Sequence, residues 1–427
     1  MRRVAITGLG AVSALGIGVP AFWAGVSSGT SGVRRISAFD PSNFLAQVAA
    51  EVPAFDPDAY FTDTEREMLD RFSQFAIVAA AEACAQANLA LAEGERDRAG
   101  VAIGSAMGGA VTQDDRYRKM YGDGATRPHP FTIPRIMNNA PAAHISMRHG
   151  LRGPALAIAT ACAASAHAIG EATEMIRTGR ADVMIAGGAD APIAPGVVRC
   201  WEAMRVMAPP PPGEPSRACR PFSKDRLGMV LGEGAGMIVL EAWERAAARG
   251  AAIIGEVAGY AATADADHMT QPGVHAPARA IELALAQARL SPADIDYVNA
   301  HGTGTRLNDS TETTILKRAF GDHAATLAIS STKAVHGHAM GATAALEAIA
   351  TVLAMQCGIA PPTANYSEPD PACDLDYVPN HPRSMPIRAS ISNSFAFGGL
   401  NAVLVLKRAE SAEAPASRRQ AADSGPR

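Results

Sequence analysis

The sequence of 427 residues predicts an α/β fold made of two related halves, and three observations lead to this prediction. Residues 156–170 and 327–341 are identical at 7 of 15 positions, and such self-similarity indicates a duplicated structural unit. Short apolar runs alternate with helical segments, which is typical of mostly parallel sheets. Hydrophobic residues make up 48% of the chain, a composition that suits a buried sheet and argues against disorder.

In the first half, each predicted strand is a short apolar run followed by glycines or small residues. The alanine-rich segment 75–89 has the composition of a helix, and another helix is expected from residue 163, directly after a strand. Within this half the predicted strands cover 4–7, 101–104, 156–159, 183–186 and 237–241.

The second half repeats this logic. Its first helix is expected over 277–288, with Pro277 at the first helical position, where proline is tolerated. A later helix is expected over 339–355. The predicted strands of this half cover 254–260, 297–300, 327–330, 389–392 and 402–406.

We expect the first half to occupy residues 1–250 and the second half residues 251–408. Residues 409–427 are small, polar and charged, which predicts a disordered tail. The proline-rich stretch 208–216 predicts a surface loop.

Composition excludes several classes of protein. The net charge of −4, the absence of a long basic run and an aromatic content of 5% argue against nucleic-acid binding. No run approaches the roughly 18 continuous apolar residues of a membrane span. The six cysteines contain no Cys-x-x-Cys pair, which indicates free thiols, a reducing compartment and no zinc site. We therefore expect a cytoplasmic protein.

The two copies of the repeat differ where chemistry is expected. Cys162 in the first copy is equivalent to Lys333 in the second, so one copy offers a nucleophile and the other a cation. Cys162 lies where a strand passes into a helix, and the helix N-terminus favours the thiolate. The alternative is that Cys162 is a small buried hydrophobic residue.

Three histidines are candidates for a chemical role beside this cysteine. His301 follows a predicted strand directly, and ligands of α/β proteins bind at the carboxyl ends of strands. His336 and His338 are two residues apart, so on a helix only one of them can share a cleft with Cys162. The alternative for His301 is a hydrogen-bonded turn, while His167 inside the first copy's helix is expected to be structural.

Two further segments have alternative interpretations. Thr303 and Thr305 either bind a polar arm of a substrate or cap the next helix. The glycine-rich segment 392–399 either contributes a backbone N–H to an oxyanion hole, together with that of Cys162, or is a tight turn.

Taken together, these segments resemble the β-ketoacyl-acyl-carrier-protein synthases, the condensing enzymes of the thiolase fold. The resemblance runs from Val4 to about Arg408 and implies a duplicated five-layer αβαβα fold. The motifs that carry it are Thr160-Ala161-Cys162, His301-Gly-Thr-Gly-Thr with Asn308-Asp309, Lys333 with Gly337-His338, and Asn393-Ser-Phe-Ala-Phe-Gly-Gly.

The resemblance implies a decarboxylative Claisen condensation with malonyl-carrier protein. Cys162 would accept an acyl chain as a thioester, and His301 and His338 would stabilise the enolate. Lys333 would orient the site electrostatically, paired with Glu347. The backbone N–H groups of Cys162 and Phe397 would form the oxyanion hole.

The resemblance also implies binding positions. Thr303 and Thr305 would bind the phosphopantetheine arm, Phe397 would gate the site, and Met107, Cys200 and Phe395 would contact the acyl chain. Asn393 would support the site, and a monovalent cation is implied near Asn299, Glu347 and Asn393; no other metal is expected.

No permanently bound cofactor is implied, because phosphopantetheine arrives on the acyl carrier protein. The implied partners are the acyl and malonyl forms of that carrier. The implied assembly is a homodimer or a heterodimer with a related subunit, formed through the region 134–147.

Two related functions are less consistent with the residues. A thiolase needs a second cysteine in the turn 394–399, which has none. A non-catalytic chain-length subunit lacks the active-site cysteine, whereas Cys162 is present. A ketosynthase of a polyketide or nodulation-type system that works with such a subunit remains the alternative function.

Departures from the family pattern concern the acyl substrate. Ala396 replaces a usual glycine, which predicts a stiffer gate. Cys200-Trp201 stands where the housekeeping enzyme carries a bulky phenylalanine. Either the smaller Cys200 enlarges the acyl pocket, which predicts tolerance of medium-to-long or unsaturated chains, or Trp201 fills the same space.

Overall fold

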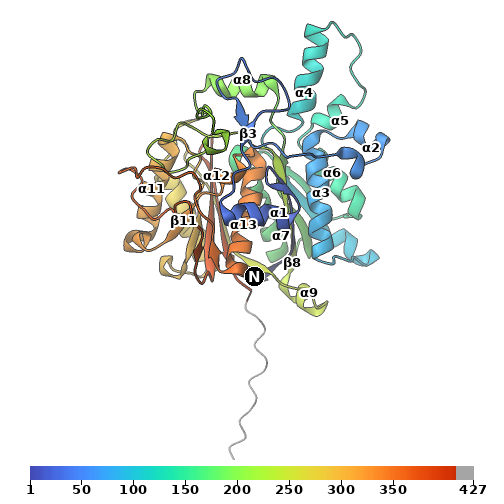
Figure 1. The fold of residues 1–427 in the computed structure, drawn as a ribbon. Coiled ribbons are helices and arrows are strands. Elements are labelled where there is room, and N and C mark those ends of the chain that lie inside the picture. The colour runs from blue at the N-terminus through green and yellow to red at the C-terminus, as the bar shows by residue number, and fades with distance from the viewer. Residues whose placement is uncertain (410–427) are drawn as a thin grey trace, which may run out of the picture.

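The computed structural model describes residues 1–409 (Figure 1). Apart from its first residue, the predicted tail 409–427 lies outside the described residues. The described chain forms an α/β structure in which two half-sheets enclose a pair of central helices.

Apart from the two-residue strand β2, which pairs with β1, each half of the chain contributes five strands to the main sheet, and the two sets have the same spatial order. When the five strands of each half are numbered along the chain, their order across the sheet is third, second, fourth, fifth and first. The directions also match, since the first three strands of this order are parallel and the last two are antiparallel to their neighbours. The first half-sheet consists of β6 (Ala155–Ile158), β5 (Ala99–Gly104), β7 (Val183–Asp190), β8 (Gly234–Ala242) and β1 (Val4–Ser13). The second consists of β11 (Ala328–Ser330), β10 (Tyr297–Asn299), β14 (Ala389–Ala396), β15 (Leu400–Lys407) and β9 (Gly255–Ala264). The duplication predicted from the repeat is therefore confirmed.

A short pairing between β1 and β9 joins the two half-sheets, through Ala5 with Glu256 and Ile6 with Gly255. The chain passes from the first set of strands to the second after α9 (Trp243–Ala248). Because only two residue pairs make this seam, most of the contact between the halves runs through the helices between them.

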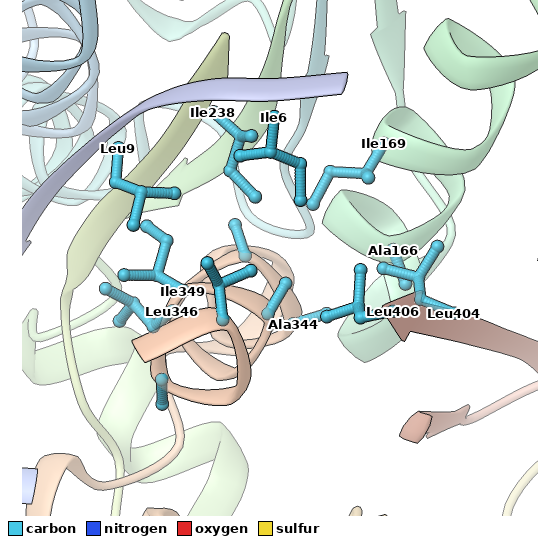
Figure 2. Packing of buried hydrophobic residues seen from close by; sticks show 14 of the residues in the cluster. Ile6, Leu9, Ala166, Ile169, Ile238, Ala344, Leu346, Ile349, Leu404 and Leu406 are labelled. Carbon is cyan, nitrogen blue, oxygen red and sulfur yellow. The ribbon is translucent and has the colours of Figure 1, made fainter. Parts of the chain in front are cut away.

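The central layer consists of α7 (Ala164–Arg177) and α13 (Thr343–Cys357) (Figure 1). Figure 2 shows side chains from both half-sheets and both helices meeting there, among them Ile6, Leu346 and Leu404. The outer face of the first half-sheet is covered by α3 (Arg71–Gln86) and α6 (Ala140–His149), and that of the second by α10 (His275–Ala288) and α11 (Arg306–Phe320). The five layers αβαβα are as predicted.

The segment Met340–Cys357, which includes α13, is long and apolar enough by composition to cross a membrane. It is not a continuous apolar run, because it contains Thr343, Glu347 and Thr351, so the sequence prediction that no such run exists is not contradicted. Moreover, 89% of the segment is buried inside the fold, which is the position of a core helix.

Several predicted boundaries are wrong. β1 continues to Ser13, beyond the predicted end at residue 7, and Gly8 and Gly10 are strand residues. A Cβ at Gly10 would lie 1.8 Å from the Ala79 carbonyl oxygen, so these glycines let α3 pack directly on the strand. α10 begins at His275, which puts Pro277 at the third helical position. α3 begins at Arg71, after the N-cap Asp70, and α13 begins at Thr343.

The remaining helices and strands connect or flank these layers. They are β2 (Gly16–Ile17), α1 (Val19–Ser28), β3 (Arg34–Arg35), β4 (Val48–Ala49), α2 (Asp63–Met68), α4 (Ala110–Tyr117), α5 (Thr132–Ile136), α8 (Pro195–Ala203), α12 (Lys333–His336), β12 (Ile359–Ala360) and β13 (Arg383–Ser384). In Figure 1, α4 projects beyond the layered body at the top of the view.

Candidate active site

A cavity of about 300 Å³ brings the predicted segments together. Residues far apart in the sequence line it because the carboxyl ends of parallel strands meet at one edge of each half-sheet. Predicted site residues in its lining are Cys162, His301, Thr303, Thr305, His338, Phe395 and Phe397. The rest of the lining is largely apolar and includes Trp201, Met204, Val206, Met229 and Met269.

Cys162 lies in a one-turn helix, Ala161–Ala163, between β6 and α7. Ala161 has a φ of 47°, so the chain turns sharply here through a conformation that non-glycine residues seldom adopt. Burial raises the pKa of the Cys162 thiol to about 11, although the charge of Lys333 acts in the opposite direction. The predicted preference for the thiolate is therefore wrong for the resting site, and the thiol must lose its proton when it reacts.

His301 and His338 lie edge to face at the cavity wall, with ring centroids 5.7 Å apart and ring planes at 85°. Both are buried. Burial, reinforced by the charge of Lys333, holds the pKa of each imidazole well below its usual value. Both rings are therefore neutral at pH 7, so each can donate one N–H without placing a net charge in the site.

Contacts at the Nδ1 atoms orient the two rings. Nδ1 of His338 lies 2.9 Å from the Thr343 hydroxyl, and Nδ1 of His301 lies 3.5 Å from Nζ of Lys333. When these groups donate to Nδ1, the ring proton is on Nε2. The two Nε2–H groups are then free to bind a developing negative charge.

Lys333 is the first residue of α12 and is fully buried. Its ammonium donates to Oε1 of Glu347 at 2.5 Å and to the carbonyl oxygen of His301. Burial raises the pKa of Glu347 to about 7, while Lys333 favours its charged form. The geometry agrees with the predicted pairing of these two residues and places a cation behind both imidazole rings.

Glu312 is a site residue whose role the sequence did not reveal. In the sequence it stands three residues after Asp309, a spacing that is also typical of a local cap and ion-pair cluster. Its carboxylate instead accepts the backbone N–H groups of His301 at 2.8 Å and Gly302 at 2.7 Å, and the side-chain amide of Asn393 at 3.2 Å. Glu312 therefore fixes the turn that carries His301. No single-sequence signal separates this carboxylate from a surface ion pair.

Asp190, at the end of β7, was also missed. Its buried carboxylate accepts the Ser105 hydroxyl and the N–H groups of Ala106, Met107 and Gly341, at 2.7 to 3.0 Å. Burial raises its pKa to about 6. Asp190 thus ties a loop of the first half to the turn that follows His338. A carboxylate after Gly-Gly-Ala at a strand end was the available signal.

Thr303 and Thr305 line the cavity, with their hydroxyl oxygens 2.9 Å apart. Thr305 occupies the N-cap position of α11 but makes no side-chain capping hydrogen bond. The capping alternative therefore does not explain its hydroxyl.

Phe395 and Phe397 close one side of the cavity. The ring of Phe395 lies 6.0 Å from that of His301, and the ring of Phe397 stacks on Trp201 at 6.0 Å and 25°. Phe397 is the first residue of the turn 397–399, which follows β14.

The predicted acyl-pocket role of Cys200 is not supported. Its side chain is exposed and does not line the cavity, whereas Trp201 does. Neighbouring residues on a helix point about 100° apart, so α8 presents only one of the two to the cavity. Met107 packs against the apolar cluster that contains Cys162 but is not part of the cavity lining.

The other histidines lie away from the cavity lining. His336 is buried, with Nε2 3.0 Å from the Thr332 hydroxyl and Nδ1 2.9 Å from the Gly337 carbonyl oxygen. His167 contacts the Ala163 carbonyl oxygen at 2.9 Å through Nδ1. Of the pair His336 and His338, the structure brings His338 alone to Cys162, in agreement with the prediction.

The residues expected around a monovalent cation include buried oxygen atoms without partners. Oδ1 of Asn299 and Oδ1 of Asn393 are buried and have no hydrogen-bond partner. Nδ2 of Asn299 points toward the backbone oxygen of Glu347 at 3.5 Å. Oxygen donors of this kind suit a hard cation. Within residues 1–409, no cluster of three or more His, Cys, Asp or Glu residues could hold a metal ion.

Known proteins of one family are similar to this chain over most of its length. The family model "Beta-ketoacyl synthase, N-terminal domain" matches residues 1–246, and "Beta-ketoacyl synthase, C-terminal domain" matches residues 254–367. Nodulation protein E from Rhizobium meliloti (strain 1021) is 48% identical over 407 residues, which cover 95% of this chain and 99% of the relative.

Two further similarities extend across the same region. The 3-oxoacyl-[acyl-carrier-protein] synthase 2 of Coxiella burnetii (strain RSA 493 / Nine Mile phase I) is 42% identical over 409 residues, covering 95% of this chain and 99% of the relative. The solved structure of the ishigamide ketosynthase/chain length factor superposes with a TM-score of 0.88 at 37% identity, covering 96% of this chain and 100% of that one.

Proposed function

The chain belongs to the β-ketoacyl synthase family, and on that premise we propose that it elongates an acyl group held on Cys162. The reaction is a decarboxylative Claisen condensation with malonyl-acyl-carrier protein. The observation that carries the proposal is the convergence of Cys162 with two neutral imidazoles, His301 and His338, in one cavity.

In the loading step, the sulfur of Cys162 attacks the carbonyl carbon of an acyl thioester on the carrier protein. A new C–S bond forms, the old C–S bond breaks, and the proton of Cys162 passes to the departing thiolate. This transfer is required because the resting cysteine is protonated. The N–H groups of Cys162 and Phe397 bind the oxyanion of the tetrahedral intermediate.

In the condensation step, the malonyl carboxylate leaves as carbon dioxide and its bonding electrons form an enolate. Nε2–H groups of His301 and His338 donate to the enolate oxygen. The enolate carbon attacks the acyl carbonyl on Cys162, a C–C bond forms, and the C–S bond breaks. The released Cys162 thiolate then takes a proton from water. Burial, reinforced by the charge of Lys333, keeps both imidazoles neutral throughout.

The carrier protein presents its substrate on a phosphopantetheine arm. The hydroxyls of Thr303 and Thr305 at the cavity wall are suited to bind the polar amides of this arm. The name of the Coxiella burnetii relative, which includes an acyl carrier protein, supports this partner. Asn299, Glu347 and Asn393 would hold a monovalent cation, which would supply fixed positive charge beneath the site.

The chain would pair with a second copy or a related subunit along the edge of the first half-sheet. β6 ends the sheet order, and its Leu156 is 37% exposed. Ile133 and Met147, which flank or lie in the region 134–147, are 62% and 68% exposed. A dimer at micromolar concentration is expected by light scattering, and Leu156→Glu should weaken it. A monomeric parent protein would contradict this assembly.

A second candidate function is the same reaction performed together with a non-catalytic chain-length subunit. The solved ketosynthase/chain length factor structure favours it. If the chain alone forms no elongated product but does so with a co-expressed subunit, this second function holds. A cytoplasmic location is proposed from the six unpaired cysteines.

The proposal is tested by intact-mass analysis after incubation with a panel of acyl-carrier proteins. The parent protein should gain the mass of one acyl group, and Cys162→Ala should gain none. Adding malonyl-carrier protein should then remove the acyl mass and yield a β-ketoacyl-carrier protein. Acylation of Cys162→Ala would refute the assignment of the nucleophile.

A further inference from the structure

Trp201 and Phe397 form a stacked aromatic pair at the cavity, and we call this pair the aromatic latch. Their ring centroids are 6.0 Å apart and their planes are 25° from parallel. Both rings line the cavity that contains Cys162. The latch therefore forms part of the wall of the cavity that contains the cysteine.

One side of the latch is firmly fixed. Trp201 lies on α8, whose first turn is held by the carboxylate of Asp114, which accepts the Gly196 N–H at 3.0 Å. Near its C-terminus, Glu202 accepts the Ala46 N–H at 2.8 Å.

A third attachment holds the middle of α8. The Arg199 guanidinium lies 3.8 Å above the ring of Phe44 and also donates to the Asn43 carbonyl oxygen at 2.6 Å. With attachments along its whole length, α8 provides a stationary surface.

The other side of the latch lies on a short turn. Phe397 is followed by Gly398 and Gly399, whose φ angles of 83° and 68° are readily adopted by glycine alone. The Gly398 N–H donates to the Met269 carbonyl oxygen at 2.7 Å and the Gly399 N–H donates to the Ala396 carbonyl oxygen at 3.0 Å. The Gly399 carbonyl oxygen accepts the Asp265 N–H at 2.9 Å and the side-chain amide of Asn401 at 3.1 Å. A glycine backbone changes conformation at low steric cost, so this turn is the side of the latch that would move.

We propose that Trp201 is a positioning residue that holds the Phe397 turn closed over acylated Cys162 and so protects the thioester from water. The inference rests on the proposed function, because it requires an acyl-enzyme that waits for its second substrate. The reaction it suppresses is hydrolysis. A water oxygen attacks the acyl carbonyl carbon, the C–S bond breaks, a carboxylic acid leaves, and the water's proton returns Cys162 to the thiol.

The size of the effect follows from the contact that is lost. A single aromatic pair stabilises a closed arrangement by a factor of roughly two to ten. In Trp201→Ala, hydrolysis of the acyl-enzyme should accelerate by about this factor, because the open population rises in proportion. Trp201→Phe keeps a ring at the same place and should remain close to the parent protein.

The experiment follows the acyl-enzyme by intact mass after the carrier protein is removed and without malonyl-carrier protein. The exposed neighbour Cys200→Ala is the matched control, since it changes the same helix but not the cavity lining. Faster loss of the acyl mass in Trp201→Ala alone supports the latch. Equal rates in all variants would overturn it. A parent protein that never gains acyl mass would refute the proposed function instead.

A second readout needs no substrate. In a Cys200→Ala background, the rate at which iodoacetamide alkylates Cys162 is measured by peptide mass mapping. An additional Trp201→Ala change should speed this alkylation roughly two- to tenfold. Phe397→Ala should produce a similar increase, and the double variant should add little to it, since both changes remove the same contact. Unchanged alkylation in Trp201→Ala, with an unchanged melting temperature, would refute the inference.

Discussion

His336 offers a measurable test of how burial controls charge in the centre of the molecule. The ring packs 6.0 Å from that of Phe22, and its two nitrogens contact the Thr332 hydroxyl and the Gly337 carbonyl oxygen. Burial, with a further contribution from Lys333, lowers its pKa to about 3. Replacing it in His336→Asn keeps an amide donor for the carbonyl and removes the titrating group.

The magnitude follows from proton linkage. In the unfolded chain this histidine binds a proton below its usual pKa of 6.5, whereas the folded protein keeps the ring neutral down to about pH 3. The contribution of this ring to the free energy of unfolding is therefore fully present above pH 6.5 and is lost as the pH falls below that value. At pH 5, one and a half units below the unfolded pKa, the loss from this single ring is about 2 kcal/mol. This figure is insensitive to the folded pKa, provided that the value stays well below 5.

The assay is urea unfolding of the parent protein and of His336→Asn at pH 7 and pH 5. The variant loses stability at both pH values through altered packing. Its free energy of unfolding should, however, fall by about 2 kcal/mol less than that of the parent protein between pH 7 and pH 5. His381→Asn, at an exposed histidine, should leave the drop unchanged. Identical drops in the parent and His336→Asn would show that the ring is not held neutral. Condensation activity at pH 7 should fall only mildly in His336→Asn.

Further changes address the reacting groups and their supports. His301→Ala and His338→Ala should each slow condensation at least roughly a hundredfold, whereas acyl loading should be affected less. Rapid-quench measurement separates the two steps, and equal losses in both would contradict the enolate role. Asp190→Asn leaves two backbone N–H groups facing an amide, which should lower the free energy of unfolding in urea by about 2–6 kcal/mol. Asp190→Glu serves as the comparison, and an unchanged urea midpoint in Asp190→Asn would contradict this role of the carboxylate. Glu347→Gln leaves the Lys333 ammonium buried without a carboxylate and should lower the free energy of unfolding by about 3–5 kcal/mol. Replacing both residues by apolar ones should recover much of this stability. Equal stability of the single and double variants would refute the pairing argument.

The fold was largely predictable because its evidence is local in the sequence. The repeat places Cys162 and Lys333 at equivalent elbows, and the strand order shows the same duplication in space. The errors arose where contacts decide the outcome. Gly8 and Gly10 were read as the end of a strand, yet they are strand residues on which α3 packs. Whether a glycine interrupts a strand or admits a neighbour depends on a helix some seventy residues away.

The site was predictable in its residues but less so in its electrostatics. The helix dipole at Cys162 is a local effect, whereas the burial that raises its pKa comes from segments across the whole chain. The choice between Cys200 and Trp201 depends on the rotation of α8 about its axis, which follows from its attachments to Asp114 and Ala46. Asp190 and Glu312 act on backbone N–H groups, and such roles leave little pattern in a single sequence.

The central position of α13 has a consequence for synthesis of the chain on the ribosome. The strands and helices of the first half are complete by α9. Its helix α7 covers part of the inner face of the sheet, but α13, which covers the rest of that face near β8, is finished about a hundred residues later. At about 5–20 residues per second, the nascent first half therefore exposes that apolar face for roughly 5–20 s. During this interval the chain is open to aggregation and is a natural substrate for chaperones. Heterologous production should accordingly improve at low temperature or with added chaperones, and a fragment that ends before α13 should be insoluble.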